Sequence, residues 1–186
     1  MTIKRYPKAV VFDLDYTLWP CWCDTHITMP IKAVSDSQII DRSGMKLGFF
    51  KDVESIILEL IDNNVKIIGA SRTAAPYIAE ELLSLLHISN TPAIKYFDSL
   101  QWGTGSKVKH ITKAAKQLNM ELELKEGEFI LFDDELRNRD VRSINCHFGH
   151  VFDEDEGLTR NIFLEELKLW EQSITTGEFK ESRFNF

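Results

Sequence analysis

Short apolar runs alternate with amphipathic segments along most of this 186-residue chain, and each run stops at a polar or acidic residue. Ala9–Phe12 is followed by Asp13, and the run over residues 65–70 is followed by Ser71. A third run over residues 129–132 is followed by Asp133. Uninterrupted apolar runs are typical of strands buried on both faces between crossover helices. The pattern therefore predicts an α/β protein with a three-layer, Rossmann-like fold, a parallel sheet with helices on both faces.

The same pattern predicts the remaining elements. Helices are expected over residues 52–63, 75–86, 106–118 and 158–170, with a short helix ending at 141–144 and further strands at 94–97 and 146–152. Residues 16–51 are too many for a simple turn between strand and helix. We expect them to form a small flap insertion, in the form of a β-hairpin, with no large cap domain. The chain is expected to be one domain over residues 1–186, with a loosely held tail over about 173–186.

Composition narrows the class of partners. A formal net charge of −7 argues against a broad nucleic-acid surface. Three cysteines are too few for a disulfide framework, and no apolar stretch reaches the roughly 18 residues of a membrane span. The apolar run near the N-terminus ends at the acidic residue Asp13 and is too short for a secretory signal. We therefore expect a protein without membrane or nucleic-acid partners, cytoplasmic with the nucleus as the alternative, and monomeric.

Polar residues at the ends of the expected strands point to one ligand site. In open parallel sheets, ligands bind outside the carboxyl ends of the strands. The residues that topology brings there are Asp13, Asp15, Ser71, Arg72, Asp133, Asp134 and Glu135, with Lys107 at the start of a helix. Carboxylates this crowded cannot all stay ionised without compensation, and Mg²⁺ is the divalent ion that accepts a few carboxylates while keeping waters. The sequence predicts a magnesium site that receives a phosphate.

Four segments resemble the motifs of the haloacid dehalogenase superfamily. They are FDLDYTLWP (Phe12 to Pro20), ASRT (Ala70 to Thr73), GSK (Gly105 to Lys107) and LFDDELRN (Leu131 to Asn138). The aromatic first motif and the ending of the fourth are similar to the magnesium-dependent phosphatase 1 subfamily. The resemblance covers about residues 8–151, with all four motifs in order.

The resemblance implies a role for each motif residue. Asp13 would be the nucleophile that becomes an aspartyl phosphate, and Asp15 the general acid and then base. Leu14, Ser71, Arg72 and Lys107 would bind phosphate or substrate. Mg²⁺ would be held by Asp13, Asp15 (through its main-chain carbonyl) and Asp134, with Thr17, Asp133 and Asn138 in support. The substrate would be a small phosphate ester, such as a sugar phosphate, or a phosphotyrosine protein.

Other interpretations remain beside this one. A dehalogenase would need neither Mg²⁺ nor an acid at Asp15, and a receiver domain would carry its phosphorylated Asp on a later strand. A non-catalytic phosphate-binding module would share the fold. Cys21, Cys23 and His26 lack the further ligands of a structural zinc site. His147 and His150 are expected to be structural, and Trp19, Trp22, Phe49 and Phe50 either line a substrate pocket or pack the flap.

Overall fold

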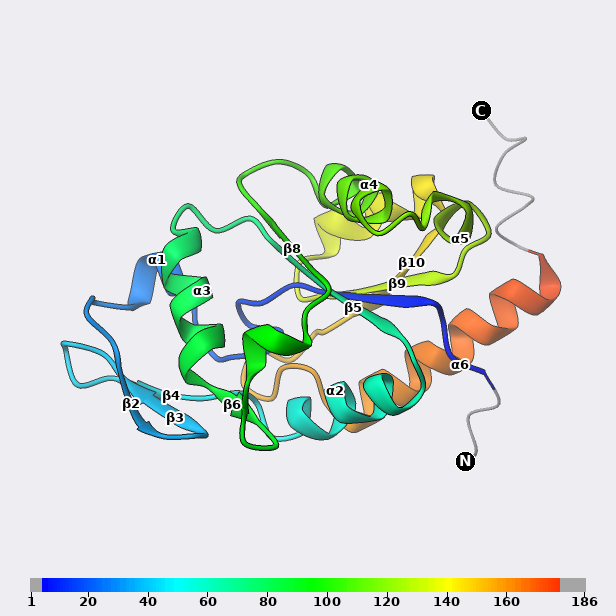
Figure 1. Cartoon of the computed structure of the whole chain (residues 1–186). Coiled ribbons are helices and arrows are strands. Elements are labelled where there is room, and N and C mark those ends of the chain that lie inside the picture. Colours follow the sequence, from blue (N-terminus) through cyan, green and yellow to red (C-terminus); the bar gives the residue numbers. More distant parts are fainter. Residues whose placement is uncertain (1–4, 178–186) are drawn as a thin grey trace.

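The computed structural model describes residues 5–177 and has a five-stranded parallel sheet at its centre (Figure 1). The strand order is β10–β9–β1–β5–β8. The bounds are β1 (Ala9–Phe12), β5 (Lys66–Ser71), β8 (Ser99–Trp102), β9 (Phe129–Asp133) and β10 (Cys146–His150). Phe12 pairs with Gly69 of β5 on one side and with Phe132 of β9 on the other. The three central strands therefore end side by side, which brings Asp13, Ser71 and Asp133 to one edge.

Helices cover both faces of the sheet, as the sequence pattern predicts (Figure 1). One face carries α4 (Lys107–Gln117), α5 (Glu121–Lys125) and the 3₁₀ helix η2 (Leu136–Ile144). The other carries α2 (Val53–Asp62) and α6 (Arg160–Thr176), and its core extends to α3 (Pro76–Leu85). Alternate residues of β1 separate the two cores, since Val10 and Phe12 lie in one and Ala9 and Val11 in the other. The expected three-layer architecture is confirmed.

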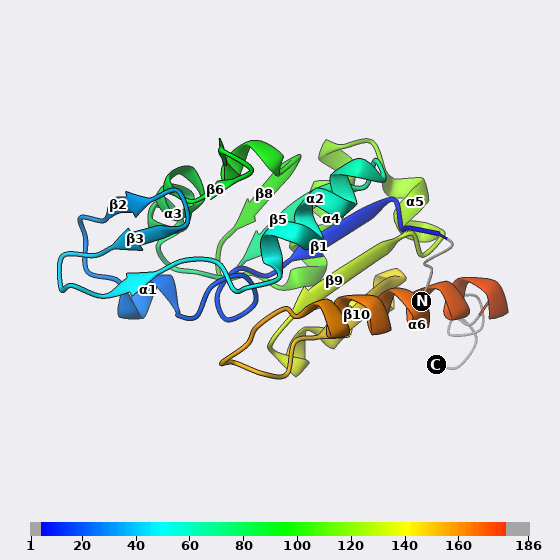
Figure 2. The same ribbon diagram turned by 90° about the horizontal axis from the view of Figure 1, so that it is seen from below.

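The insertion after β1 is larger than the expected hairpin. It holds a short helix, α1 (Cys23–His26), and a three-stranded antiparallel sheet of β2 (Lys32–Ser35), β3 (Gln38–Ile40) and β4 (Lys46–Leu47). Figure 2 shows it at the end of the molecule toward which the parallel strands run. Ile39 and Leu47 join the main core, so the insertion packs on the domain.

The edge of the sheet differs from the sequence prediction. Residues 94–97, expected as a strand, fall mostly in the 3₁₀ helix η1 (Ala93–Tyr96), which follows a small hairpin of β6 (His87–Ile88) and β7 (Thr91–Pro92). The strand is β8 instead, and its buried side chains are Ser99 and Gln101. Gln117 of α4 accepts hydrogen bonds from both, at 3.0 Å and 2.9 Å. Because this buried face is polar, an apolar run could not reveal it.

Two of the predictions concern the C-terminal part of the chain. The last helix continues to Thr176, beyond the expected end at residue 170, so residues 173–176 are helical. The rest of the predicted tail, residues 178–186, lies outside the described residues. Within the described part of the chain, no helix is both long and apolar enough to cross a bilayer.

Candidate active site

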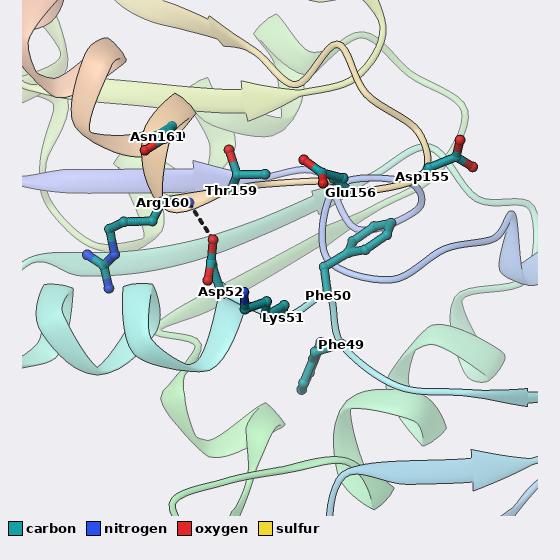
Figure 3. A pocket seen from close by; sticks show the side chains of 9 residues that line it. All are labelled: Phe49, Phe50, Lys51, Asp52, Asp155, Glu156, Thr159, Arg160 and Asn161. Carbon is teal, nitrogen blue, oxygen red and sulfur yellow. Dashed lines mark hydrogen bonds between the residues drawn. The ribbon is translucent and has the colours of Figure 1, made fainter.

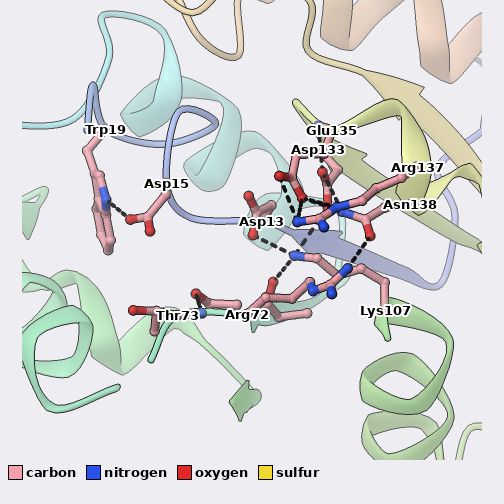
Figure 4. A network of polar contacts seen from close by, with 12 residues as sticks. Asp13, Asp15, Trp19, Arg72, Thr73, Lys107, Asp133, Glu135, Arg137 and Asn138 are labelled. Atoms are coloured by element: carbon pink, nitrogen blue, oxygen red, sulfur yellow. Dashed lines mark hydrogen bonds and ion pairs between the residues drawn. The ribbon is translucent and has the colours of Figure 1, made fainter. Parts of the chain in front are cut away.

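Asp13 follows β1 directly and lies at the centre of the polar network in Figure 4. Its main-chain N–H donates to the carbonyl of Phe132 at 2.9 Å, which continues the sheet by one residue. Its Oδ1 accepts a hydrogen bond from Lys107 Nζ at 2.5 Å. The side chain is nearly buried, so its carboxylate has this ammonium in place of bulk water.

Lys107 is the first residue of α4, and Ser106 caps that helix by accepting from the N–H of Lys109. Only 1% of the lysine is exposed, although an isolated lysine in a sequence is most often a surface residue. Its ammonium also lies 3.2 Å from Asp133 Oδ2 and donates to the carbonyl of Ala70. Burial favours the neutral amine, but the charges of Asp13 and Asp133 outweigh it and hold the pKa of Lys107 above its ordinary value. The site therefore keeps a buried cation.

Asp133 ends β9 and is completely buried. Both of its oxygens accept from Asn138 Nδ2 at 2.9 Å, and Oδ1 also accepts from the N–H of Glu135 at 2.8 Å. With Lys107 on Oδ2, every side of this carboxylate has a donor. Asp133 therefore fixes the loop after β9 and the position of the lysine.

Asp134 completes a group of three carboxylates. One oxygen each from Asp13, Asp133 and Asp134 lies within 4.8 Å of the others. Burial raises the pKa of Asp134 to about 6, and the charge of Asp133 adds to the effect. Burial also raises the pKa of Asp13 well above its usual range, against the opposing charge of Lys107. One ammonium leaves this cluster short of positive charge, so a hard divalent cation with oxygen ligands fits it.

Asp15 has a different environment from Asp13. Its Oδ1 accepts from Trp19 Nε1 at 2.7 Å (Figure 4) and from the N–H of Cys23 at 3.2 Å. Burial raises its pKa, while these two hydrogen bonds lower it. Its carboxylate is not in the group of three, which among residues 5–177 contains Asp133 instead. The carbonyl of Asp15 as a metal ligand stays a prediction.

The Ser71 loop forms the opposite side of the site. Ser71 is buried, and its hydroxyl accepts from the N–H of Thr73 at 3.2 Å. The Arg72 guanidinium reaches the Asn138 side-chain oxygen and the Thr104 carbonyl, each at 3.5 Å. Arg72 thus contacts the segment after β9 through Asn138, and its role in binding substrate stays a prediction.

The turn after Asp13 places two further motif residues. Leu14 is fully buried, and its carbonyl accepts from the N–H groups of Thr17 at 3.2 Å and Leu18 at 2.8 Å. The buried Thr17 hydroxyl has no hydrogen-bond partner within the described residues. Both side chains support the turn from inside the protein.

Three hydrogen bonds at the site could not be predicted from the sequence. Two are donated to Asp15, by the indole N–H of Trp19 and by the main-chain N–H of Cys23. The third is donated by His150 Nε2 to the carbonyl of Asp134, at 3.0 Å. The first two depend on how the insertion folds back over β1. The third depends on the register of β10, which pairs His150 with Asp133.

A cavity of about 460 Å³, shown in Figure 3, is not lined by Asp13, Asp133 or Asp134. It is lined by Phe49, Phe50, Lys51, Asp52, Asp155, Glu156, Thr159, Arg160 and Asn161. Phe49 stacks on the buried Trp19 with ring centres 6.2 Å apart. Trp19 therefore packs the insertion, whereas Phe49 both packs on Trp19 and lines this cavity.

Comparison with solved structures identifies the fold of this chain. A haloacid dehalogenase superfamily hydrolase from Ehrlichia chaffeensis superposes with a TM-score of 0.57 over 91% of this chain and 98% of that one, at 15% identity. The N-terminal part of BF1531 from Bacteroides fragilis, which contains a phosphatase domain complexed with Mg, gives 0.58 over 89% of this chain and 41% of that one, at 16% identity. The chain has the haloacid dehalogenase fold.

Sequence comparison is more specific. Residues 5–173 match the acid phosphatase family. The Saccharomyces cerevisiae protein YER134C is 40% identical over 171 residues, which cover 87% of this chain and 96% of that protein. Human magnesium-dependent phosphatase 1 is 36% identical over 150 residues, 80% of each chain. This chain belongs to the acid phosphatase family of the haloacid dehalogenase superfamily.

Proposed function

We propose that this chain is a magnesium-dependent phosphatase that hydrolyses phosphate monoesters through an aspartyl phosphate on Asp13. The observation that carries the proposal is the convergence of Asp13, Lys107 and Asp134 at one edge of the sheet. Phosphoryl transfer needs three kinds of group. They are a nucleophilic carboxylate, a buried ammonium, and a further carboxylate that lacks a neighbouring cation and can bind a metal ion. The names of the human relative and of the Bacteroides structure, which mention magnesium, support the choice of ion.

The first half of the reaction is a displacement at phosphorus. A carboxylate oxygen of Asp13 attacks the phosphorus atom, and the bond from phosphorus to the ester oxygen breaks. Lys107 holds Oδ1 of Asp13, which fixes the rotation of the nucleophile, and its charge opposes the charge of the phosphoryl oxygens. Ser71 and Arg72 on the opposite loop, with main-chain amides around Leu14, would bind those oxygens.

Asp15 carries the proton in both halves. Trp19 and Cys23 donate to its Oδ1, so we assign the transferable proton to Oδ2. Burial favours the protonated form, as a general acid requires. Asp15 gives this proton to the leaving oxygen. It then takes one from water, which attacks phosphorus, releases phosphate and regenerates the Asp13 carboxylate.

Asp13 and Asp134 would hold the magnesium ion together with the carbonyl of Asp15, while Asp133 supports them. When bound, the ion supplies the positive charge that lets a phosphate dianion approach this acidic group. Asp133 fits the supporting role because its oxygens already accept from Asn138, Glu135 and Lys107.

A panel of phosphate esters, assayed with and without metal, tests the proposal. Sugar phosphates, phosphotyrosine and small alkyl phosphates should be hydrolysed to different extents. Chelation should abolish activity, and Mg²⁺ should restore it far better than Ca²⁺, whose larger and more flexible coordination shell misplaces the nucleophile. Full turnover in chelated protein would overturn the metal assignment. Phosphate binding without turnover of any ester would favour a binding module.

A further inference from the structure

The short helix α1 ties together the two loops of the candidate site. On one side, the N–H of Cys23 donates to Asp15. On the other, Asp24 Oδ2 accepts from the N–H of Ala74 at 2.9 Å, and Cys23 Sγ lies 3.4 Å from Thr73 Oγ1. Both partners lie within three residues of Ser71. The segment therefore lies between the proposed acid and the proposed phosphate loop.

The outer side of this segment carries an exposed indole. Trp22 is 49% exposed, whereas Trp19 and Trp170 are fully buried. His26 stacks on it with ring centres 5.5 Å apart and planes 16° apart, and its Nδ1 accepts from the N–H of Trp22 at 3.1 Å. Tyr16 meets it edge-on, with ring centres 5.4 Å apart. Two neighbours therefore hold the orientation of an indole that still faces solvent.

Tyr16 connects this aromatic group to the carboxylates. Its φ of 55° lies in the left-handed region, which a tyrosine rarely adopts, and its N–H donates to the carbonyl of Trp19 at 2.8 Å. It directly follows Asp15, whose carboxylate accepts from Trp19 and Cys23. A strained residue held in place beside a reacting group is a feature of functional sites.

We propose that the indole of Trp22, positioned by Tyr16 and His26, is the leaving-group subsite and binds the face of an aromatic ring. This inference rests on the proposed function, because it places the phosphoryl group at Asp13. An exposed indole loses water from its face when a flat ring stacks on it, and aromatic pairs gain binding energy beyond that of area burial alone. Trp22 is therefore a specificity-determining residue outside the four motifs.

Calorimetry with two phosphonates, which cannot be hydrolysed, tests the subsite without turnover. In the presence of Mg²⁺, the wild-type protein should bind benzylphosphonate about tenfold more tightly than propylphosphonate. Trp22→Ala should remove that preference and leave propylphosphonate affinity within about twofold of wild type. Trp22→Phe should retain most of the preference. Leu122→Ala, which removes an exposed side chain from α5 at the other end of the sheet, is the control and should change neither affinity.

Kinetics with phenyl phosphate, glucose 6-phosphate and glycerol phosphate complete the test. Trp22→Ala should raise KM for phenyl phosphate with little change in kcat. An equal loss for all three esters would assign Trp22 a structural role and overturn the subsite, as would a loss confined to glucose 6-phosphate. If the wild type hydrolyses none of them but keeps a Trp22-dependent preference for benzylphosphonate, the proposed function fails and the subsite stands.

Discussion

Two aspartates only two residues apart have different hydrogen-bond partners in this protein. Burial raises the pKa of both carboxyls, but Asp13 is paired with the ammonium of Lys107, whose charge opposes that shift and favours the ionised carboxylate that can attack phosphorus. Among the described residues, Asp15 accepts from an indole N–H and an amide N–H and has no such cation beside it. Environment, and not residue type, therefore separates the nucleophile from the acid.

Asp13→Asn should abolish turnover, because an amide cannot form the acyl phosphate. The fold should survive, since the amide oxygen can still accept from Lys107. Activity with a phosphate ester and the far-UV circular dichroism of the same preparation check both parts. Near-normal activity in a folded Asp13→Asn protein would remove the covalent mechanism.

Asp15→Asn should lower kcat by about 10²- to 10⁴-fold on alkyl phosphates, the usual contribution of a positioned acid or base. The loss should be smaller with nitrophenyl phosphate, because nitrophenolate leaves without a proton. Steady-state kinetics on the two esters give the comparison. An equal loss on both would mean that Asp15 does not protonate the leaving group.

Asp134 should make the chelated protein less stable as pH rises. Its pKa is about 6 in the folded protein against an ordinary 3.8, so the stability it contributes is present below the ordinary value and is lost as pH rises through about 6. Asp134→Asn should therefore raise the melting temperature of chelated protein near pH 8 and change it little near pH 4. The exposed Asp140 gives the control variant, Asp140→Asn. A melting temperature that does not respond to Asp134→Asn near pH 8 would contradict this account.

At the scale of elements, the sequence predicted the central strands well and the sheet edge and the insertion poorly. β1, β5 and β9 have buried apolar side chains in both cores, so their runs are unmistakable. β8 instead buries Ser99 and Gln101 against Gln117, which no apolar pattern reveals. The sequence predicted that Asp15 belongs to the site, but it did not predict the orientation of the Asp15 side chain. That orientation depends on the left-handed turn at Tyr16 and on the return of the chain at Cys23.

The insertion should depend on one buried carboxylate. Asp41 accepts from the N–H of Thr28 at 2.8 Å, the N–H of Met45 at 2.9 Å and the Ser43 hydroxyl at 2.7 Å. The bond from Ser43 and these main-chain donors hold its pKa below the ordinary value. Asp41→Ala should speed amide exchange at residues 28 and 45 about tenfold and leave β1 unchanged. Asp36→Ala, in the exposed β2–β3 turn, is the matched control, and equal exchange in the two variants would contradict the prediction.

At the scale of the whole molecule, a chain of net charge −7 gathers three carboxylates at the edge where we propose that the phosphate binds. Only the ends of parallel strands bring Asp13, Asp133 and Asp134 so close together, and Lys107 is buried between two of them. The sequence predicted this convergence because topology alone sets it. The family resemblance implies a supporting role for Asp133, and that role stays a prediction; its oxygens accept from Asn138 and from the N–H of Glu135.

Magnesium should therefore stabilise the folded protein. A free magnesium concentration about 100 times the dissociation constant adds about 2.7 kcal/mol to the free energy of unfolding. For a domain of this size, that raises the melting temperature by roughly 5–10 °C. Asp134→Ala should lose most of that shift, and Asp140→Ala none of it. A shift of equal size in Asp134→Ala would place the ion elsewhere.

The stereochemistry of phosphoryl transfer tests the central claim, that the phosphoryl group passes through Asp13 before it reaches water. A phosphorothioate ester made chiral at phosphorus by its sulfur and two oxygen isotopes is hydrolysed in water of the third isotope, and the configuration of the released thiophosphate is determined. Two successive displacements, first by Asp13 and then by water, predict retention of configuration. Inversion would show a single direct attack by water and would contradict the account.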